Sequence, residues 1–145
     1  MSNELFELMI MLLKKCSLSE QKIRNEFKLS LAEYNGLLAL DNGEKILCNV
    51  FSKKMGLSPS RGSRITNRLI EKGFLKSKRL IDDKRGLVVF LSRKGRLMKE
   101  KLGQRMRECE RKIQKHLSAK KRKEVKDALR ILSEVMEREV PDAIQ

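Results

Sequence analysis

Start and stop signals between residues 30 and 92 divide this part of the chain into short helices followed by two strands. Ser30-Leu31-Ala32-Glu33 has the spacing of a capping box, in which the Ser hydroxyl and the Glu carboxylate accept hydrogen bonds from free backbone N–H groups. Gly56 and Gly73 each follow a helical run, where a residue with positive φ ends a helix. Ser58-Pro59 opens the helix between them, because Ser caps a helix and Pro fits its first position. The signals predict helices over about 31–40, 46–55 and 59–72.

The residues after Gly73 predict a β-hairpin. Two β-like runs, Phe74–Leu80 and Leu87–Leu91, surround the polar tip Ile81-Asp82-Asp83-Lys84-Arg85-Gly86, which is rich in turn formers. A helix, a turn, a second helix and a hairpin therefore follow one another within this segment.

Both ends of the chain predict amphipathic helices with broad apolar stripes. Residues 4–15 form the first, and Ser19-Glu20-Gln21 begins a second piece or continues the first after a kink. Ser92 and Ser118 cap two more helices, with the stripes Leu97, Leu102, Met106, Cys109, Ile113 and Leu117, and Val125, Leu129, Leu132 and Val135 or Met136. Because a chain of 145 residues would struggle to cover these stripes alone, we expect a homodimer.

The positive charge of the chain is concentrated in its middle. The formal net charge is +15, of which residues 46–100 carry +11. This uneven distribution is typical of a surface that binds a polyanion. The chain has no Trp and one Tyr, so the sequence supplies little for stacking the bases of single strands.

The exposed side of the helix predicted over 59–72 has side chains suited to duplex DNA. Arg bonds bidentately to guanine, Asn bonds to adenine, and Ser reaches bases or phosphates. The free N–H groups near Ser58 and Ser60 point toward the place of a phosphate, and a basic hairpin tip can enter the adjacent narrow groove. The candidate DNA-binding residues are Ser58, Ser60, Arg61, Ser63, Arg64, Asn67, Arg68, Lys84 and Arg85.

The stretches LSLAEYNGLLAL, VFSKKMGLSPSRGSRITNRLIEKGFLKSKR, DDKRGLVVFLSRKG and HLSAKKRKEVKDALRILSEVMER resemble the MarR family of bacterial regulators. The resemblance runs from about Leu29 to Arg138 and is most specific from the second helix to the hairpin. It implies a homodimer with intertwined terminal helices, each subunit presenting one winged helix. It further implies that Arg64 faces bases, that Arg85 enters the minor groove, and that Asp83 braces Arg85. Ser58, Ser60 and Arg61 match positions near phosphates, whereas Asn67 and Arg68 are proposed from their exposed side alone.

The expected fold is mainly α, an α+β winged helix-turn-helix of about six helices with a two- or three-stranded β wing. We expect one MarR-like domain over residues 1–145, in which 30–92 form the DNA-binding lobe and 1–29 and 93–145 form dimerisation helices. Ser17-Leu18-Ser19 is expected to interrupt the first helix, which is usually one long helix in the family.

The expected function is that of a sequence-specific regulator of transcription, a ligand- or signal-responsive repressor that binds double-stranded DNA at a pseudo-palindromic operator. The alternatives are a sequence-independent architectural DNA- or RNA-binding protein, and a winged helix that contacts proteins. The sequence leaves open whether a cleft between the dimerisation helices and the lobe takes a small aromatic acid, a peptide or nothing. It also leaves open whether Cys16 senses oxidants or is a structural or surface thiol.

Catalysis and metal binding find little support in the sequence. There is no nucleophile–base pair, Gly-rich phosphate loop or CxxC pair, and His116 is the single His, so we expect no enzyme, cofactor or metal. The apolar run near the N-terminus is too short to span a bilayer, and residues 1–13 carry acidic but no basic side chains, which disfavours a membrane-surface helix. We therefore expect a cytoplasmic protein.

Overall fold

The computed structural model describes residues 2–80 and 86–141. Its elements in chain order are α1 (Glu4–Glu26), α2 (Leu31–Ala39), β1 (Ile46–Leu47), α3 (Cys48–Lys54), α4 (Pro59–Glu71), β2 (Leu75–Arg79), β3 (Leu87–Leu91), α5 (Arg93–Gln114) and α6 (Ala119–Glu139). The predicted fold, a mainly α winged helix with a hairpin wing, is confirmed.

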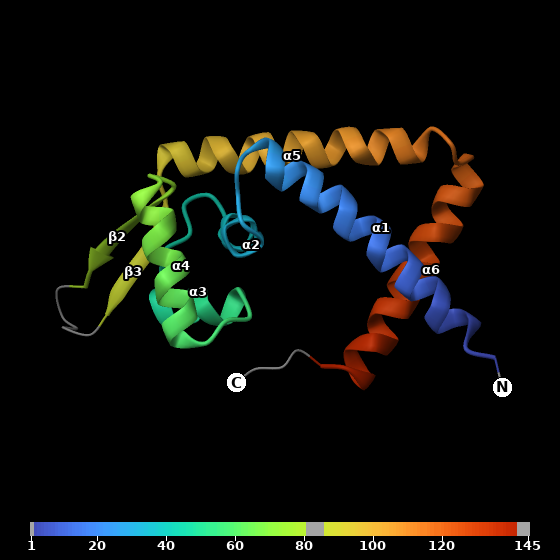
Figure 1. Ribbon diagram of the computed structural model, residues 1–145, viewed down its shortest axis with the longest axis horizontal. Helices are drawn as coiled ribbons and strands as arrows, with labels where there is room; N and C mark the ends of the chain where they lie inside the picture. The colour runs from blue at the N-terminus through green and yellow to red at the C-terminus, as the bar shows by residue number, and fades with distance from the viewer. Residues whose placement is uncertain (1, 81–85, 142–145) are drawn as a thin grey trace.

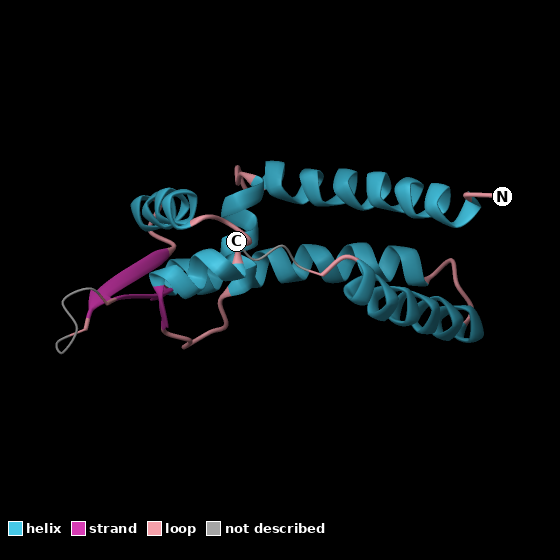
Figure 2. Cartoon of the chain, turned by 90° about the horizontal axis from the view of Figure 1, so that it is seen from below, coloured by secondary structure: helices cyan, strands magenta, loops and turns pink. Residues whose placement is uncertain are grey.

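The elements form a lobe at one end of a long helix. The lobe consists of α2, α3, α4 and the sheet, and α5 leads away from it to the turn at which α6 begins (Figure 1). In Figure 2, α1 lies at the top of the view, apart from α5 and α6, which lie below it. We call α1 and α6 the arms, because they extend away from the lobe.

The sheet has the strand order β1-β3-β2, and both pairs of strands are antiparallel. In the wing, Leu75 pairs with Leu91 and Arg79 with Leu87, and the backbone N–H of Leu80 donates to the carbonyl of Gly86 at 3.0 Å. The tip of the wing, with the candidate residues Asp83, Lys84 and Arg85, lies outside the described residues.

The core of the lobe joins α2, α3 and α4 into one packed unit. Leu37, Phe51 and Leu69, one from each helix, are fully buried. The helices α3 and α4 approach so closely that a Cβ added at Gly62 would lie 1.9 Å from Ser52 Oγ. Because only glycine fits there, the contact fixes how α4 lies on α3.

The predicted caps and stops are present. Ser30 Oγ accepts a hydrogen bond from Glu33 N at 3.1 Å, while Glu33 Oε1 accepts one from Ser30 N at 3.0 Å, which completes the capping box. Gly56 and Gly73 have φ of +70° and +82°, the left-handed backbone expected after α3 and α4. Ser92 caps α5 by accepting from Gly95 N, and its hydroxyl donates to the carbonyl of Gly73.

Two predictions about helix boundaries were wrong. The helix expected over 46–55 begins at Cys48, because Ile46 and Leu47 pair with β3 as a short strand. Leu47 and Val50 are exposed. The first helix is unbroken from Glu4 to Glu26 and passes through Ser17-Leu18-Ser19. Serine inside a helix costs only a few tenths of a kcal/mol, which the helix-forming Leu, Met, Lys and Glu residues on either side and the burial of Ile23 outweigh.

Candidate nucleic-acid interface

Helix α4 has one buried side and one exposed side, as predicted. Gly62, Thr66 and Leu69 are buried and Ile65 is half-buried. All the candidate residues on α4 and at its cap are exposed, namely Ser58, Ser60, Arg61, Ser63, Arg64, Asn67 and Arg68. The structure thus brings three guanidinium groups, an amide and three hydroxyls to one surface of the lobe.

The N-terminus of α4 is open to an anion. Ser58 Oγ accepts from Arg61 N at 3.3 Å and lies 3.5 Å from Ser60 Oγ, while Pro59 occupies the first turn. The first turn contains no acidic residue, so the partial positive charge of the helix end is not neutralised within the chain. Small side chains and this charge together suit a phosphate group.

Polar groups on the buried side of α4 and on the facing side of α3 form hydrogen bonds mostly within their own helix, and a contact between Cys48 and Thr66 joins the two helices. Thr66 Oγ1 donates to the Gly62 carbonyl at 2.7 Å and lies 3.9 Å from Cys48 Sγ. Ser52 Oγ donates to the Cys48 carbonyl at 3.1 Å. These bonds satisfy the polar groups at the α3–α4 contact, so the exposed side of α4 rests on a fixed support.

The C-terminus of α4 is tied to the start of α2 by an ion pair that the sequence did not predict. Lys72 Nζ lies 2.5 Å from Glu33 Oε2 and donates to the Lys28 carbonyl at 3.3 Å. Burial raises the pKa of Glu33, but the hydrogen bonds from Lys72 and Ser30 outweigh it and hold this pKa below its ordinary value. The carboxylate is therefore charged at neutral pH and anchors the end of α4. The capping box pointed to Glu33, but no sequence signal pointed to Lys72 as its partner.

The described part of the wing adds further basic residues that sequence reasoning missed. Lys76, Lys78 and Arg79 lie on β2, and all are exposed. Their signal was the charged alternation Leu75-Lys76-Ser77-Lys78-Arg79 beside the predicted hairpin tip. The positive surface of α4 is therefore accompanied by a second one on the described part of the wing.

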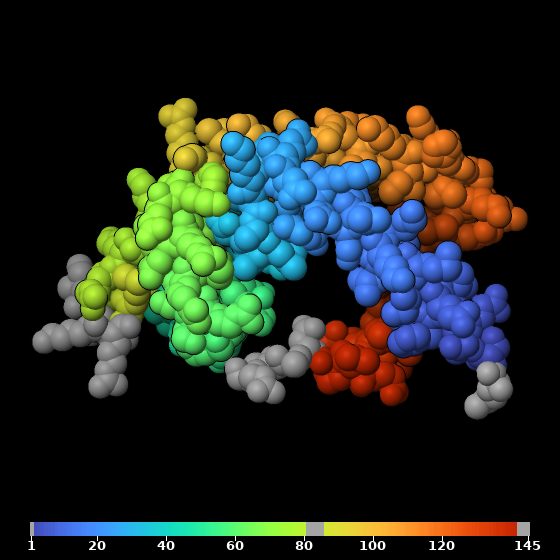
Figure 3. Space-filling model, in the orientation of Figure 1, coloured from blue at the N-terminus to red at the C-terminus, as the bar shows by residue number. Residues whose placement is uncertain are grey.

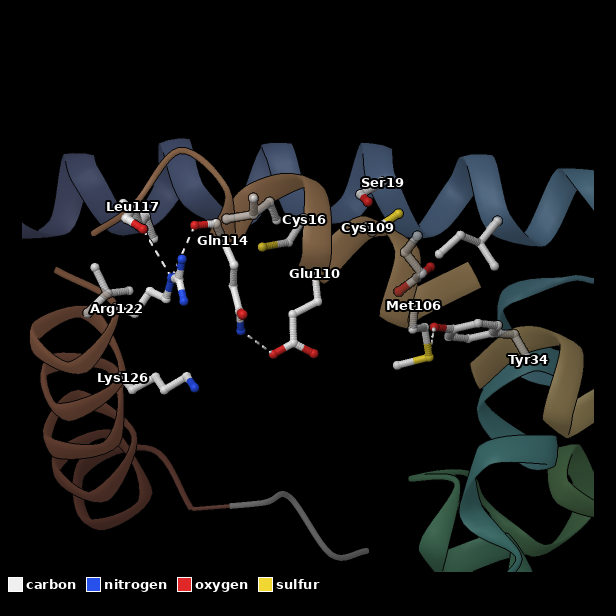
Figure 4. A pocket seen from close by; sticks show the side chains of 14 residues that line it. Cys16, Ser19, Tyr34, Met106, Cys109, Glu110, Gln114, Leu117, Arg122 and Lys126 are labelled. Carbon is white, nitrogen blue, oxygen red and sulfur yellow. Dashed lines mark hydrogen bonds between the residues drawn. The ribbon is translucent and has the colours of Figure 1, made fainter. Parts of the chain in front are cut away.

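A cavity of about 380 Å³ lies where α1, α2, α5 and α6 meet (Figure 4). Its walls are mostly apolar, with Tyr34 at one end, where Tyr34 Oη lies 3.8 Å from Met106 Sδ. Arg122 and Lys126 lie at the α6 end (Figure 4). Cys16 and Cys109 also line it, and both are free thiols, with Cys16 exposed and Cys109 half-buried. The cavity corresponds to the cleft expected between the dimerisation helices and the lobe.

Within the described residues neither a metal cluster nor a membrane-spanning helix is present. Among residues 2–80 and 86–141, no three His, Cys, Asp or Glu side chains gather as they would around a metal ion. No helix in the same part of the chain has the length and apolar character needed to cross a membrane.

The sequence matches no protein-family model and no curated protein. Solved structures are similar over most of the chain. RV1404 from Mycobacterium tuberculosis has a TM-score of 0.79 at 18% identity and covers 92% of this chain and 94% of its own. A MarR mutant from E. coli, complexed with operator DNA, has a TM-score of 0.70 at 20% identity over 90% and 94%. PcaV from Streptomyces coelicolor, in complex with its natural ligand, has 0.62 at 20% over 85% and 89%. These likenesses establish a shared MarR-like winged helix fold.

Proposed function

We propose that this chain is a MarR-type transcriptional regulator that binds double-stranded DNA in a sequence-specific manner as a homodimer. The observation that carries the proposal is the exposed side of α4, with Arg61, Arg64, Arg68 and Asn67 on a helix whose other side is packed in the lobe. The fold is shared with a MarR mutant whose structure contains operator DNA.

In this proposal α4 is the recognition helix and enters the major groove. Arg64 and Asn67 read base edges, because Arg and Asn form paired hydrogen bonds with guanine and adenine. Ser58, Ser60 and Arg61 contact phosphates at the open N-terminus of α4, and Ser63 and Arg68 lie on the same exposed side. From the family resemblance, Arg85 at the wing tip enters the minor groove and Asp83 orients it. Lys84, a candidate from the positive charge of the same tip, contacts the DNA beside Arg85.

The arms supply the dimer contact. The apolar residues of α1 and α6 are exposed in one chain, including Leu5, Leu8, Val125, Leu129 and Val135. A second copy would cover these faces, and two lobes would then read half-sites about 10 base pairs apart.

The cavity between the arms and the lobe supports a response to a small ligand. It is largely apolar with two cationic groups at one end, Arg122 and Lys126, which suits a small molecule carrying an acidic group. We infer a repressor that releases DNA when this cavity is filled. On this proposal the protein acts in the cytoplasm and has no catalytic activity or cofactor.

The test begins with selection of bound sequences from a random duplex pool. Arg64→Ala should then weaken binding to the selected operator by about tenfold or more and leave binding to a scrambled duplex nearly unchanged at the same salt. Lys101→Ala, an exposed lysine on α5, is the matched control. Equal losses on the two duplexes would refute base reading by Arg64.

The alternative is a sequence-independent architectural protein that uses the same basic surface. A tenfold excess of random duplex separates the two functions, because it barely displaces a specific complex and fully displaces a non-specific one. The polar and charged side chains on α4 favour the first outcome, since Asn67 and Ser63 have little use in purely electrostatic binding.

A further inference from the structure

The turn between α5 and α6 is a second concentration of positive charge, remote from α4. We call residues 111–123 the α5–α6 corner. Seven of these thirteen residues are Lys or Arg and none is acidic. The DNA contacts of the proposed function rely on α4 and the wing, and the proposed ligand cavity uses only Arg122 among the cations of this segment.

Six of the corner's cations are available to a partner. Arg122 is set apart, because its Nε donates to the carbonyls of Gln114 at 3.2 Å and Leu117 at 3.0 Å, which holds the turn together, and its half-buried side chain lines the cavity. The other six are exposed and form no ion pair with any residue in 2–80 or 86–141, namely Arg111, Lys112, Lys115, Lys120, Lys121 and Lys123. In contrast, Arg105 and Arg107 earlier on α5 are paired with Glu26, Glu108 and Glu100.

Three of these cations, at the start of α6, are unfavourably placed for the chain on its own, whereas Arg111, Lys112 and Lys115 lie at the C-terminal end of α5, where the helix dipole favours them. Lys120, Lys121 and Lys123 lie in or near the first turn of α6, which contains no acidic residue. Cations there repel the positive end of the helix dipole as well as one another. A bound anion would remove both penalties, so the start of α6 is arranged for an anionic partner rather than for the stability of the free chain.

The corner does not belong to the surface around α4. Helix α5 has 22 residues, which at about 1.5 Å per residue span about 33 Å. The corner lies at the end of α5 opposite to the lobe, as the orange atoms of Figure 3 show. Its cations therefore cannot contact the phosphates beside the bases that α4 of the same chain would read.

We propose that the α5–α6 corner binds the phosphate backbone of a double-stranded DNA segment other than the one read by α4. Arg111, Lys112 and Lys115 line a shallow hollow on α5, with Glu108 at its edge, and Lys120, Lys121 and Lys123 continue the positive surface onto α6. Closely spaced point charges match phosphates and carry no base specificity. The protein would thereby hold a second duplex segment near its operator.

Duplex DNA fits this surface better than a membrane or a protein does. The apolar residues of the corner, Ile113 and Leu117, line the cavity between the helices. Ile113 is 63% exposed, but helical spacing places it on the side of α5 opposite Arg111 and Lys115. The cations of α5 therefore have no apolar side chain beside them to insert into lipid, and the corner has no aromatic anchor for a protein interface.

The experiment compares two variants of equal charge in a background of Arg61→Ala, Arg64→Ala and Arg68→Ala, which removes the arginines of α4. The corner variant changes Lys112, Lys115, Lys120 and Lys121 to Gln. The control variant changes Lys14, Lys15, Lys22 and Lys101 to Gln, four exposed lysines elsewhere. Fluorescence anisotropy measures the affinity of each for a random 30-base-pair duplex at several salt concentrations.

The corner variant should bind at least tenfold more weakly at low salt, and its slope of log affinity against log salt should fall by about 3, because each lost phosphate contact contributes about 0.9. The control variant should lose less than threefold. Equal losses in both variants would overturn the proposal. So would a corner variant that becomes monomeric in sedimentation, or one that keeps duplex binding and loses binding to phosphatidylglycerol vesicles.

Two further measurements separate the possible outcomes. If α4 and the corner bind separate DNA molecules, protein bound to beads that carry an operator duplex should capture a second, labelled duplex. If they bind two segments of one molecule, lengthening the DNA on either side of the operator should raise the affinity of the protein for that duplex. The proposed function is tested independently by Arg64→Ala on the operator, so its failure would leave the result for the corner interpretable.

Discussion

The lobe keeps its apolar side chains inside the chain, whereas the arms leave theirs exposed. Leu37, Phe51 and Leu69 are fully buried between α2, α3 and α4. Of the whole length of α6 no residue is buried, and of α1 only Ile23 is. Figure 3 shows the ends of both arms standing apart from the lobe.

The difference separates two sources of stability. The lobe has a complete core of its own, so α4 is presented in a fixed orientation by each chain. The arms have exposed stripes such as Val125, Leu129 and Val135, whose burial requires another surface. We expect changes in the lobe to act on the folding of one chain, and changes in the arms to act on association.

Phe51→Ala should have the largest effect, because Phe51 is fully buried in the lobe. We expect the free energy of unfolding to fall by about 3–5 kcal/mol, the usual range for emptying such a site. Denaturant unfolding at two protein concentrations tests this. A loss that depends on concentration would contradict a core that is complete within one chain.

Leu129→Glu should weaken the association of two chains and leave the folding of one chain nearly unchanged. Leu129 is 44% exposed in one chain, so the carboxylate costs the monomer little, but a dimer would bury it without a partner. An unpaired buried charge costs about 3 kcal/mol or more, which predicts a dimer dissociation constant at least about 100-fold higher. Analytical ultracentrifugation measures it. Arg138→Glu, nine residues or about 2.5 turns farther along α6 and therefore on its opposite side, is the control, and an equal effect there would refute the proposed interface.

Gly62→Ala tests how tightly the lobe is packed. The added Cβ would lie 1.9 Å from Ser52 Oγ, and we expect a loss of about 1–3 kcal/mol in the free energy of unfolding. Gly103→Ala on α5 is the matched variant, because its Cβ meets only the flexible end of Arg107 at 3.2 Å. It should gain up to about 1 kcal/mol from helix propensity. Thermal unfolding that moves both variants in the same direction would contradict the difference in packing.

Glu33→Gln should have a smaller effect than Gly62→Ala, with a defined pH dependence. Gln keeps an acceptor for Ser30 N but loses the charge that holds Lys72, which predicts a loss of about 1 kcal/mol near neutral pH. Because the pKa of Glu33 is lowered on folding, its contribution is present above the ordinary pKa and disappears as the pH falls through the folded one. Wild type and variant should therefore converge in acid.

The ion pair between Glu26 on α1 and Arg105 on α5 serves as the comparison for Glu33→Gln. Glu26 contacts Arg105 at 2.7 Å, but both side chains are partly exposed. Glu26→Gln should therefore change the free energy of unfolding by less than about 0.5 kcal/mol. If it matched Glu33→Gln in denaturant unfolding, burial would not be what distinguishes the two pairs.

Local signals predicted most of the lobe. Gly56, Gly73 and the capping serines act through their own backbone or the next turn, so one stretch of sequence was sufficient to place the helix ends. The exposed side of α4 was equally readable, because helical spacing alone separates Arg64 from Leu69. The roles of these residues at DNA rest on chemistry and resemblance and remain predictions.

Features that depend on contacts between residues far apart in the chain could not be predicted from the sequence. Ile46 and Leu47 form a strand because β3 lies beside them, and no local signal distinguishes this from a helix start. The Glu33–Lys72 pair and the cavity beside Tyr34 likewise join residues far apart in the chain. The unbroken α1 differs from these cases, because its signal is local. The helical spacing of apolar residues continues on both sides of Ser17 and Ser19, and two serines alone do not end a helix.

The rigid connection at Ser92 limits how this protein can change in length. Its hydroxyl bonds the residue that ends α4 and caps the first turn of α5, so the lobe is locked to the start of that helix. One residue inserted into α5 would rotate everything beyond it by about 100° relative to the lobe. On the proposed function, the separation of the α4 helices of two paired chains could therefore change only in steps that approximate whole turns of α5, which would restrict the operator spacings open to variants of this chain.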